Sequence, residues 1–186
     1  MLNYSVAELR IMTEFRTMRR KRQQLTETEC TEILKKATSG VLSLLGDDGY
    51  PYGVPITPVL MGRKLYFHSA IKGHKVDAIR NSDKASFTVI DRNDVKPKEF
   101  TTYFRSVICF GKVRLIEDGT EKIEAFCKLV RRYNPDDEEG LRRAIKKDLS
   151  HLVMIEFTIE HISGKEAIEL VRMKKNDDIY PQIRNL

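Results

Sequence analysis

The sequence predicts a mainly β protein, built as a small six-stranded antiparallel barrel with helices between the later strands. Three observations predict it. Segments typical of strands follow one another across short turns, so consecutive strands are expected to pair as a meander. Helical patterns lie mostly between the last two strands, whereas a parallel α/β sheet would alternate strands and helices throughout. Gly111 interrupts a long apolar strand where the sheet is expected to bend.

The first half of the chain begins with a helix and continues with three strands. Thr26 and Glu29 form a capping-box pattern, and the apolar residues that follow at helical spacing predict a helix over 26–37. The next three segments are rich in strand-forming residues and are separated by the turns GDDG and GR: 40–45, 50–61 and 64–69.

The second half adds three strands, with helices before and between them. In order, the patterns predict a short helix over 74–81, a strand over 84–91, a charged loop over 91–100, a strand over 103–118, helices over 120–133 and 136–149, and a strand over 152–164. Residues 174–186 show no strong pattern, and we expect them to extend from the core.

Composition limits the classes of function. Hydrophobic residues make up 41% and charged residues 32% of the 186 residues, which is typical of a soluble chain with one core. No apolar run approaches the ~20 residues of a membrane span, and the N-terminus lacks a secretory pattern, so we expect a cytoplasmic protein. The net charge of +6 comes largely from one basic run within 16–22. That run has no interleaved aromatic residues, so a nucleic-acid partner is not expected.

Three cysteines lie in segments of predicted regular structure, without CxxC spacing: Cys30, Cys109 and Cys127. We interpret them as buried thiols in a reducing compartment. Cys109 lies within an apolar strand without an evident base partner, so a thiol nucleophile is not expected there.

The stretch YFHSAIKGHK, residues 66–75, is the strongest candidate for chemistry. Two histidines six residues apart lack the cysteine or carboxylate partners of a zinc site, so no metal is expected. An anion site fits better, because Gly73 allows close backbone approach and a helix starting near His74 presents free N–H groups. Ser69 and Lys75 would add a hydroxyl and a charge. A solvated turn explains the stretch in isolation equally well.

Two further segments carry unusual polar or conformational features. Prolines at 51, 55 and 58 interrupt a β-rich run, which indicates either a protected edge strand or backbone groups left free for a flat polar ligand. Arg105 and Ser106 begin an otherwise apolar strand and would face either solvent or that same ligand. The standard motifs of hydrolases, zinc proteases, P-loops and dinucleotide sites are absent from the sequence.

In this order, the segments GVLSLLGDDGYPYGVPITPVL, LYFHSAIKGHKVDAIRNSDKASFTVI and FTTYFRSVICFGKVRLIED resemble the pyridoxamine 5′-phosphate oxidase-like split-barrel flavoproteins. FHSAIKGHK and YFRSVICFGK, with MRRKRQ ahead of the first helix, resemble the nitroimidazole-resistance (Nim-type) branch. The resemblance covers roughly residues 18–165. It implies a six-stranded split barrel that forms a homodimer, with flavin mononucleotide (FMN) at the interface. It also implies an N-terminal extension over 1–17, an FMN-binding domain over 18–165 and a C-terminal tail over 166–186.

The resemblance also assigns site residues. The backbone of Val54, Pro55, Ile56 and Thr57 matches the strand that edges the isoalloxazine ring. The remaining matches are His68 and Ser69 near ribityl and phosphate, His74 and Lys75 at the phosphate, and Ser106 at the ring. The family's oxidases carry an arginine at the position of Val54, and a tryptophan and an arginine near the C-terminus. This chain has no tryptophan and its tail differs, so pyridoxamine phosphate oxidation is not expected.

The function implied is a flavin-dependent oxidoreductase of the Nim type that reduces a small planar acceptor, such as a nitroaromatic compound. His74 is the candidate catalytic residue, as a proton donor to the acceptor, although it could instead serve only as a phosphate ligand. The alternative is a non-catalytic split-barrel protein that binds flavin or haem, in which one of the four histidines would be the axial ligand.

Overall fold

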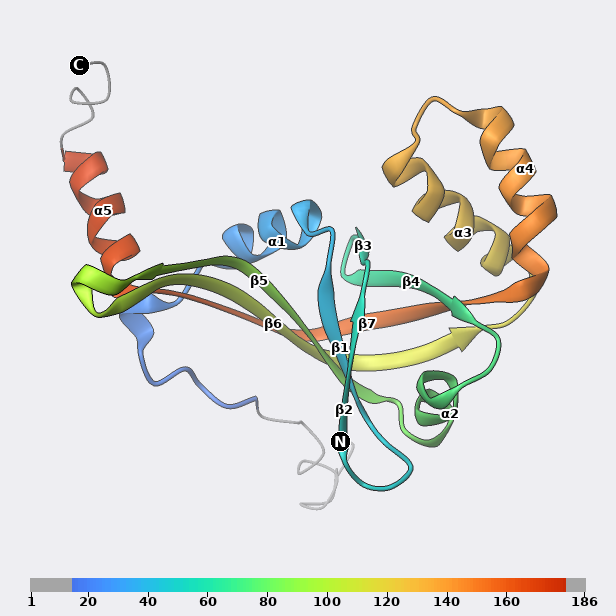
Figure 1. The fold of residues 1–186 in the computed structure, drawn as a ribbon, viewed down its shortest axis with the longest axis horizontal. Helices are drawn as coiled ribbons and strands as arrows, with labels where there is room; N and C mark the ends of the chain where they lie inside the picture. The colour runs from blue at the N-terminus through green and yellow to red at the C-terminus, as the bar shows by residue number, and fades with distance from the viewer. Residues whose placement is uncertain (1–14, 180–186) are drawn as a thin grey trace, which may run out of the picture.

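The computed structural model describes residues 15–179 and the side chains of residues 15–175. One antiparallel sheet of seven strands, in the order β2-β1-β5-β6-β7-β4-β3, forms most of the fold (Figure 1). The strands are β1 Gly40–Leu45, β2 Pro51–Ile56, β3 Val59–Met61, β4 Lys64–Ala70, β5 Lys84–Lys96, β6 Thr101–Ile116 and β7 Leu152–Glu166. This confirms the predicted mainly β, antiparallel class.

The sheet has seven strands because the proline-rich segment 50–61 divides in two. β2 pairs with β1, and β3 pairs with β4, so these two strands form opposite edges of the sheet. Only Thr57 and Pro58 join them. Three Cα steps of 3.8 Å bring the two edges within about 11 Å of each other at this point. The sheet therefore curls almost into a barrel and stays open at the β2–β3 seam.

The prediction of a loop over 91–100 is wrong, because most of this segment continues the sheet. After a bulge between Ile90 and Arg92, β5 remains paired with β6 as far as Lys96, and a short 3-10 turn, Pro97–Glu99, connects the two strands. The charged residues fit this ribbon because one of its faces is exposed and the other only half-buried; Arg92 and Asp94, on the half-buried face, form an ion pair at 2.6 Å. The expected bend at Gly111 is confirmed by a shift of register between Phe110 and Gly111.

Within residues 15–179, five α-helices pack around the sheet: α1 Glu27–Lys36, α2 His74–Asn81, α3 Gly119–Tyr133, α4 Glu138–Asp148 and α5 Ile168–Ile179. The first four agree with the prediction, and Thr26 and Glu29 form the expected capping box. The part of the tail that the structure describes begins with α5, whereas the sequence showed no strong pattern. The packing of Leu170 against Tyr103 and Ala167 anchors that helix.

Most of the core lies inside the curled sheet, where Phe67, Phe87 and Phe157 are fully buried. A second apolar cluster, around Phe126 and Met154, packs α3 against the outer side of β4 and β7. In Figure 1, α3 and α4 lie at one end of the long β6–β7 ribbon and α5 at the other, while α2 lies near the β1–β2 hairpin. None of the helices within residues 15–179 combines the length and hydropathy needed to cross a bilayer. Residues 1–14 and 180–186, parts of the predicted extension and tail, lie outside the described residues.

Candidate functional site

The N-terminus of α2 offers free backbone donors. Gly73 precedes the helix with φ of 122°, a conformation that side-chain-bearing residues rarely adopt, and no side chain among the described residues caps the helix end. The Gly73 carbonyl accepts from the N–H groups of Val76 and Asp77, so the first intrahelical bonds begin there. The N–H groups of His74 and Lys75 belong to the first turn, where no intrahelical acceptor exists. The positive end of the helix dipole is thus open to an anion.

Lys75 lies in this first turn and is half-buried. Among the described residues, no carboxylate lies within ion-pair distance of its Nζ atom. Burial lowers the pKa of Lys75 below its ordinary value, because desolvation disfavours the ammonium form. A lysine at the positive end of a helix is also opposed by the dipole. An anion bound here would offset both costs.

His68 and Ser69 lie on opposite faces of β4. Ser69 is 7% exposed and shares the inner face with Leu65 and Phe67, whereas His68 is exposed on the outer face. Successive side chains of a strand point to opposite faces, so these neighbours cannot contact one ligand from the same side of β4. The structure therefore brings Ser69, five residues before α2, to the inner face without His68.

His74 is held by the β1–β2 hairpin. Its ring stacks on Tyr52, with centroids 4.0 Å apart and 17° between planes. Its Nε2 atom lies 3.2 Å from Oδ1 of Asp47, in the turn between the two strands. Sequence reasoning missed both partners. The GDDG turn gave no signal for this role, but Tyr52 belongs to the proline-rich segment already singled out.

Of the segment 54–57, the first three residues lie on the open edge strand β2, and Thr57 follows in the link to β3. Val54 and Ile56 are half-buried and belong to the same face as Tyr52, while Pro55 is exposed on the other face. Among the strands that the structure describes, β2 has β1 as its neighbour on one side and none on the other. The stack of His74 on Tyr52 therefore places the start of α2 beside the strand that carries Val54 and Ile56.

Ser106 lies apart from this group. It pairs with Ile90 on β5 and Lys165 on β7, and β6 stands three strands away from β2. At about 4.8 Å per strand, that separation is roughly 14 Å across the sheet. Ser106 also shares the outer face with Ile108, whereas Val54 faces inward. Within one chain, the structure does not bring Ser106 to the helix end.

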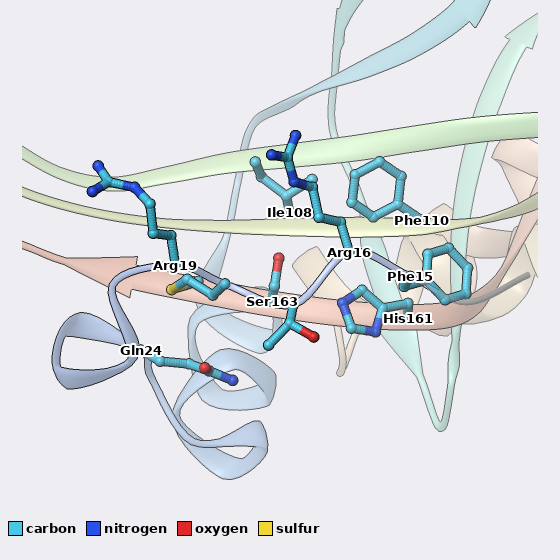
Figure 2. A pocket seen from close by; sticks show the side chains of 10 residues that line it. Phe15, Arg16, Arg19, Gln24, Ile108, Phe110, His161 and Ser163 are labelled. Atoms are coloured by element: carbon cyan, nitrogen blue, oxygen red, sulfur yellow. The ribbon is translucent and has the colours of Figure 1, made fainter.

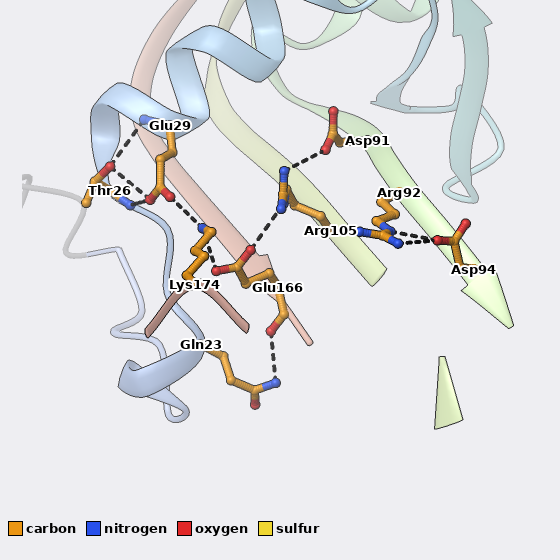
Figure 3. Close-up of polar contacts among 9 residues, drawn as sticks. All are labelled: Gln23, Thr26, Glu29, Asp91, Arg92, Asp94, Arg105, Glu166 and Lys174. Atoms are coloured by element: carbon orange, nitrogen blue, oxygen red, sulfur yellow. Dashed lines mark hydrogen bonds and ion pairs between the residues drawn. The ribbon is translucent and has the colours of Figure 1, made fainter. Parts of the chain in front are cut away.

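Arg105 belongs to a structural network and not to this site (Figure 3). Its guanidinium donates to Glu166 at 3.1 Å and lies 3.5 Å from Asp91. Glu166 is 3% exposed and also accepts from Lys174 of α5 at 2.7 Å. Lys174 donates in turn to Glu29 of α1 at 2.6 Å. These contacts tie α1, α5 and β6 to β7. The charge of Arg105 is therefore paired with carboxylates of the fold and needs no ligand.

Burial removes the cysteines from the candidate nucleophiles. Cys30 and Cys109 are 1% and 0% exposed, and desolvation raises the pKa of their thiols to about 11 and about 12. Cys127 is half-exposed on α3, so the interpretation of all three cysteines as buried thiols is wrong for this one. Within residues 15–179, no group of three or more histidine, cysteine or carboxylate side chains converges as a metal site would require.

Comparison with solved structures shows relatives of the same fold. A candidate 5-nitroimidazole antibiotic resistance protein of Bacteroides thetaiotaomicron is 21% identical, with a TM-score of 0.62 over 77% of this chain and 86% of its own. The flavocytochrome Anf3 of Azotobacter vinelandii is 21% identical, with a TM-score of 0.68 over 81% and 72%. An FAD- and haem-binding protein of Mycobacterium smegmatis is 20% identical, with a TM-score of 0.63 over 78% and 73%.

A search of curated proteins gives no match. The family model described as pyridoxamine 5′-phosphate oxidase matches residues 26–166, from the cap of α1 to the last residue of β7. The match therefore includes every strand of the sheet and the whole of α2. The chain belongs to the pyridoxamine 5′-phosphate oxidase family.

Proposed function

We propose that this protein is an FMN-dependent oxidoreductase of the Nim type, which acts as a homodimer on a small planar acceptor such as a nitroaromatic compound. The observation that carries the proposal is Lys75: a half-buried ammonium, without a carboxylate partner among the described residues, at the uncapped start of α2. Such a charge costs stability unless an anion binds it. The phosphate of a flavin nucleotide fits that requirement.

The relatives support a flavin as the ligand class. These relatives include a flavocytochrome, an FAD- and haem-binding protein and a candidate nitroimidazole resistance protein. FMN is favoured over FAD because the helix end and Lys75 form one compact anion site, which suits a single phosphate. Bound flavin would supply the electron transfer to the acceptor. The flat edge along Val54–Thr57 would then orient the ring.

His74 is proposed to hold or donate a proton near the acceptor. Asp47 and the Tyr52 ring fix the orientation of the imidazole, which a proton donor requires. The same two contacts direct Nε2 toward Asp47, so this role needs His74 to exchange the carboxylate for a ligand. If it does not, His74 supports the phosphate site through the position of the helix start.

The placement of Ser106 supports a dimer. A flavin held at α2 of one subunit is separated from Ser106 of that subunit by three strands and by the thickness of the sheet. A second copy could present Ser106 to the ring from outside. A dimer would also cover exposed apolar residues of this outer face, among them Ile90, which is 69% exposed.

The test is a spectrum followed by affinities. The purified protein, with FMN added if necessary, is expected to show bound-flavin absorption, and FMN is expected to bind more tightly than riboflavin, which lacks the phosphate. Lys75→Ala and Ser69→Ala should weaken FMN binding, while Lys72→Ala, an exposed lysine of the same stretch, should not. Under anaerobic conditions, a nitroaromatic compound should reoxidise the chemically reduced flavoprotein.

Other outcomes would separate the alternatives. A Soret band in place of flavin absorption would favour a haem-binding protein. Tight flavin binding with no reoxidation by any acceptor would favour a non-catalytic carrier. Equal affinity for FMN and riboflavin would show that the start of α2 does not bind the phosphate. Tighter binding of FAD than of FMN would indicate FAD as the cofactor. Sedimentation of the flavin-loaded protein as a monomer would contradict the dimer.

A further inference from the structure

A cavity of about 750 Å³ lies between the N-terminal segment 15–19 and the outer face of β6 and β7 (Figure 2). Its volume is in the range of small-molecule sites, roughly 300–1,000 Å³. None of the residues assigned to the flavin lines it. Sequence reasoning treated the basic part of this segment as a solvated face, so the cavity is a feature that only the fold reveals.

One end of the cavity is aromatic. The ring of Phe15 stacks on His161 of β7, with centroids 4.6 Å apart and 9° between planes. Phe110 of β6 lies 5.9 Å from Phe15 in a tilted arrangement. Phe110 is still 40% exposed and Ile108 36% exposed, so apolar surface remains for a ligand to cover. A flat ring would gain both burial and stacking here.

The other end is cationic. Arg19 lies at the end opposite the stacked rings of Phe15 and His161, with Arg16 between them (Figure 2). Among residues 15–175, no aspartate or glutamate lines the cavity. Within the part of the chain that the structure describes, neither arginine forms an ion pair, whereas Arg105 and Arg114 on the neighbouring strand both do. The guanidinium groups are therefore available to an anionic ligand.

We propose that this cavity binds planar aromatic carboxylates. The ring would lie against Phe15, His161 and Phe110, and the carboxylate would accept hydrogen bonds from Arg16 or Arg19, whose forked donors match its geometry. Ser163 lines the cavity between the two ends and adds a hydroxyl. An aromatic compound without charge would use only the first of these ends.

The site is close to the outer-face position of Ser106, two residues along β6 from Ile108. In the proposed flavoprotein, this position would make aromatic carboxylates the acceptor class. That last step rests on the proposed function, but the binding itself does not, because no flavin contact contributes to the cavity.

The test uses the full-length protein without flavin and two isosteric probes, 4-nitrobenzoate and 4-nitrobenzamide, in calorimetric titrations. The benzoate is expected to bind about tenfold more tightly than the neutral amide, since each charge-assisted hydrogen bond contributes on that scale. The double substitution Arg16→Gln/Arg19→Gln should abolish this preference. Lys21→Gln, which removes a charge from the same exposed run but not from the cavity, should leave it unchanged.

A second measurement locates the ligand. The chain has four histidines, so the imidazole signals of His161 can be assigned in NMR spectra by the His161→Gln variant. Those signals should shift on addition of 4-nitrobenzoate, and those of His151 should not. Equal affinity for the two probes, an unaltered preference in the double variant, or an unmoved His161 signal would each overturn the proposal. If the protein bound the benzoate but not FMN, the proposed aromatic carboxylate site would be supported and the proposed flavin-dependent function would be wrong.

Discussion

At the scale of the residue, Lys75 and the buried thiols show how this fold treats ionisable groups. Lys75 is charged where both burial and the helix dipole oppose a cation, and the described residues give it no carboxylate. Cys30 and Cys109 lie in the core as neutral thiols. The charge of Lys75 lowers the stability of the fold, and ligand binding would offset that loss. The buried thiols are part of ordinary core packing.

Replacing Lys75 by Met should stabilise the flavin-free protein while it weakens flavin binding. The substitution keeps the apolar stem and removes the charge, so the free energy of unfolding should rise by about 0.3–1 kcal/mol, the usual size of a helix-end charge effect. Urea unfolding of the flavin-free protein measures the first change, and FMN titration the second. Lys72→Met is the control, because Lys72 is exposed and precedes the helix. A destabilised Lys75→Met variant would show that the charge supports the fold.

The buried thiols should be unreactive in the folded protein. Burial raises the pKa of Cys30 to about 11 and of Cys109 to about 12, so a thiol reagent at about pH 8 should modify only the half-exposed Cys127 quickly. Both thiols stay protonated in the fold, whereas in the unfolded chain they ionise near their ordinary pKa of 9.0. Their contribution to stability should therefore be complete below that pH and be lost as pH rises toward about 12. Three fast thiols in the native protein would contradict the burial.

At the scale of the element, the sequence predicts best where local signals agree. The capping box at Thr26 and the apolar periodicity of α3 are local, and both helices form where expected. The ribbon over 91–100 was missed because its pairing with the start of β6 is a tertiary contact, and its charged composition resembles that of a loop. The division of 50–61 into β2 and β3 depends on the closure of the sheet, although the prolines marked where it occurs.

The candidate site was predictable to the same extent. Strand alternation alone implies that His68 and Ser69 face opposite sides, and this information lay in the sequence. The stack of His74 on Tyr52 joins residues from separate elements, so no local pattern could indicate it. The position of Ser106 on the outer face follows from the register of β6, which the sequence alone leaves open.

Gly111 is the element-scale feature with the clearest test. A side chain there would overlap the backbone carbonyl of Thr158 on β7, because the bulge brings the two strands together. Gly111→Ala should lower the free energy of unfolding by about 1–3 kcal/mol, the usual range for overpacking. Denaturant unfolding measures it. Gly53→Ala is the control, since Gly53 lies on the exposed edge strand and its nearest obstacle is the Val41 side chain, at 3.2 Å. Equal losses in the two variants would argue against a tight bulge.

At the scale of the whole molecule, β7 is the strand to which the outer elements are tied. Near one end, Glu156 is 3% exposed and accepts from Lys64, Tyr66 and Arg114. Arg114 also pairs with Glu121 of α3. At the other end, Lys174 joins Glu166 to Glu29, and so α5 to α1. Two carboxylate-centred networks thus hold helices against one strand at both ends of the ribbon.

Acid should therefore lower the free energy of unfolding of the whole protein. Burial alone would raise the pKa values of Glu29 and Glu156, but hydrogen bonds from Lys174 and Thr26 lower that of Glu29 to about 2, and those from Arg114, Lys64 and Tyr66 lower that of Glu156. Because both pKa values lie below the unfolded value of 4.5, their stabilisation is present above that pH and is lost as pH falls through the folded values. Urea unfolding should show a free energy of unfolding that decreases as the pH falls from about 6 to about 3.

The substitution Glu156→Gln should lower the free energy of unfolding by about 1–3 kcal/mol near neutral pH and flatten its pH dependence. Glu139→Gln, which breaks only an exposed pair with Arg143 on α4, should change neither. If the Glu156→Gln variant kept the pH dependence of the unmodified protein, the β7 network would not be a source of acid sensitivity.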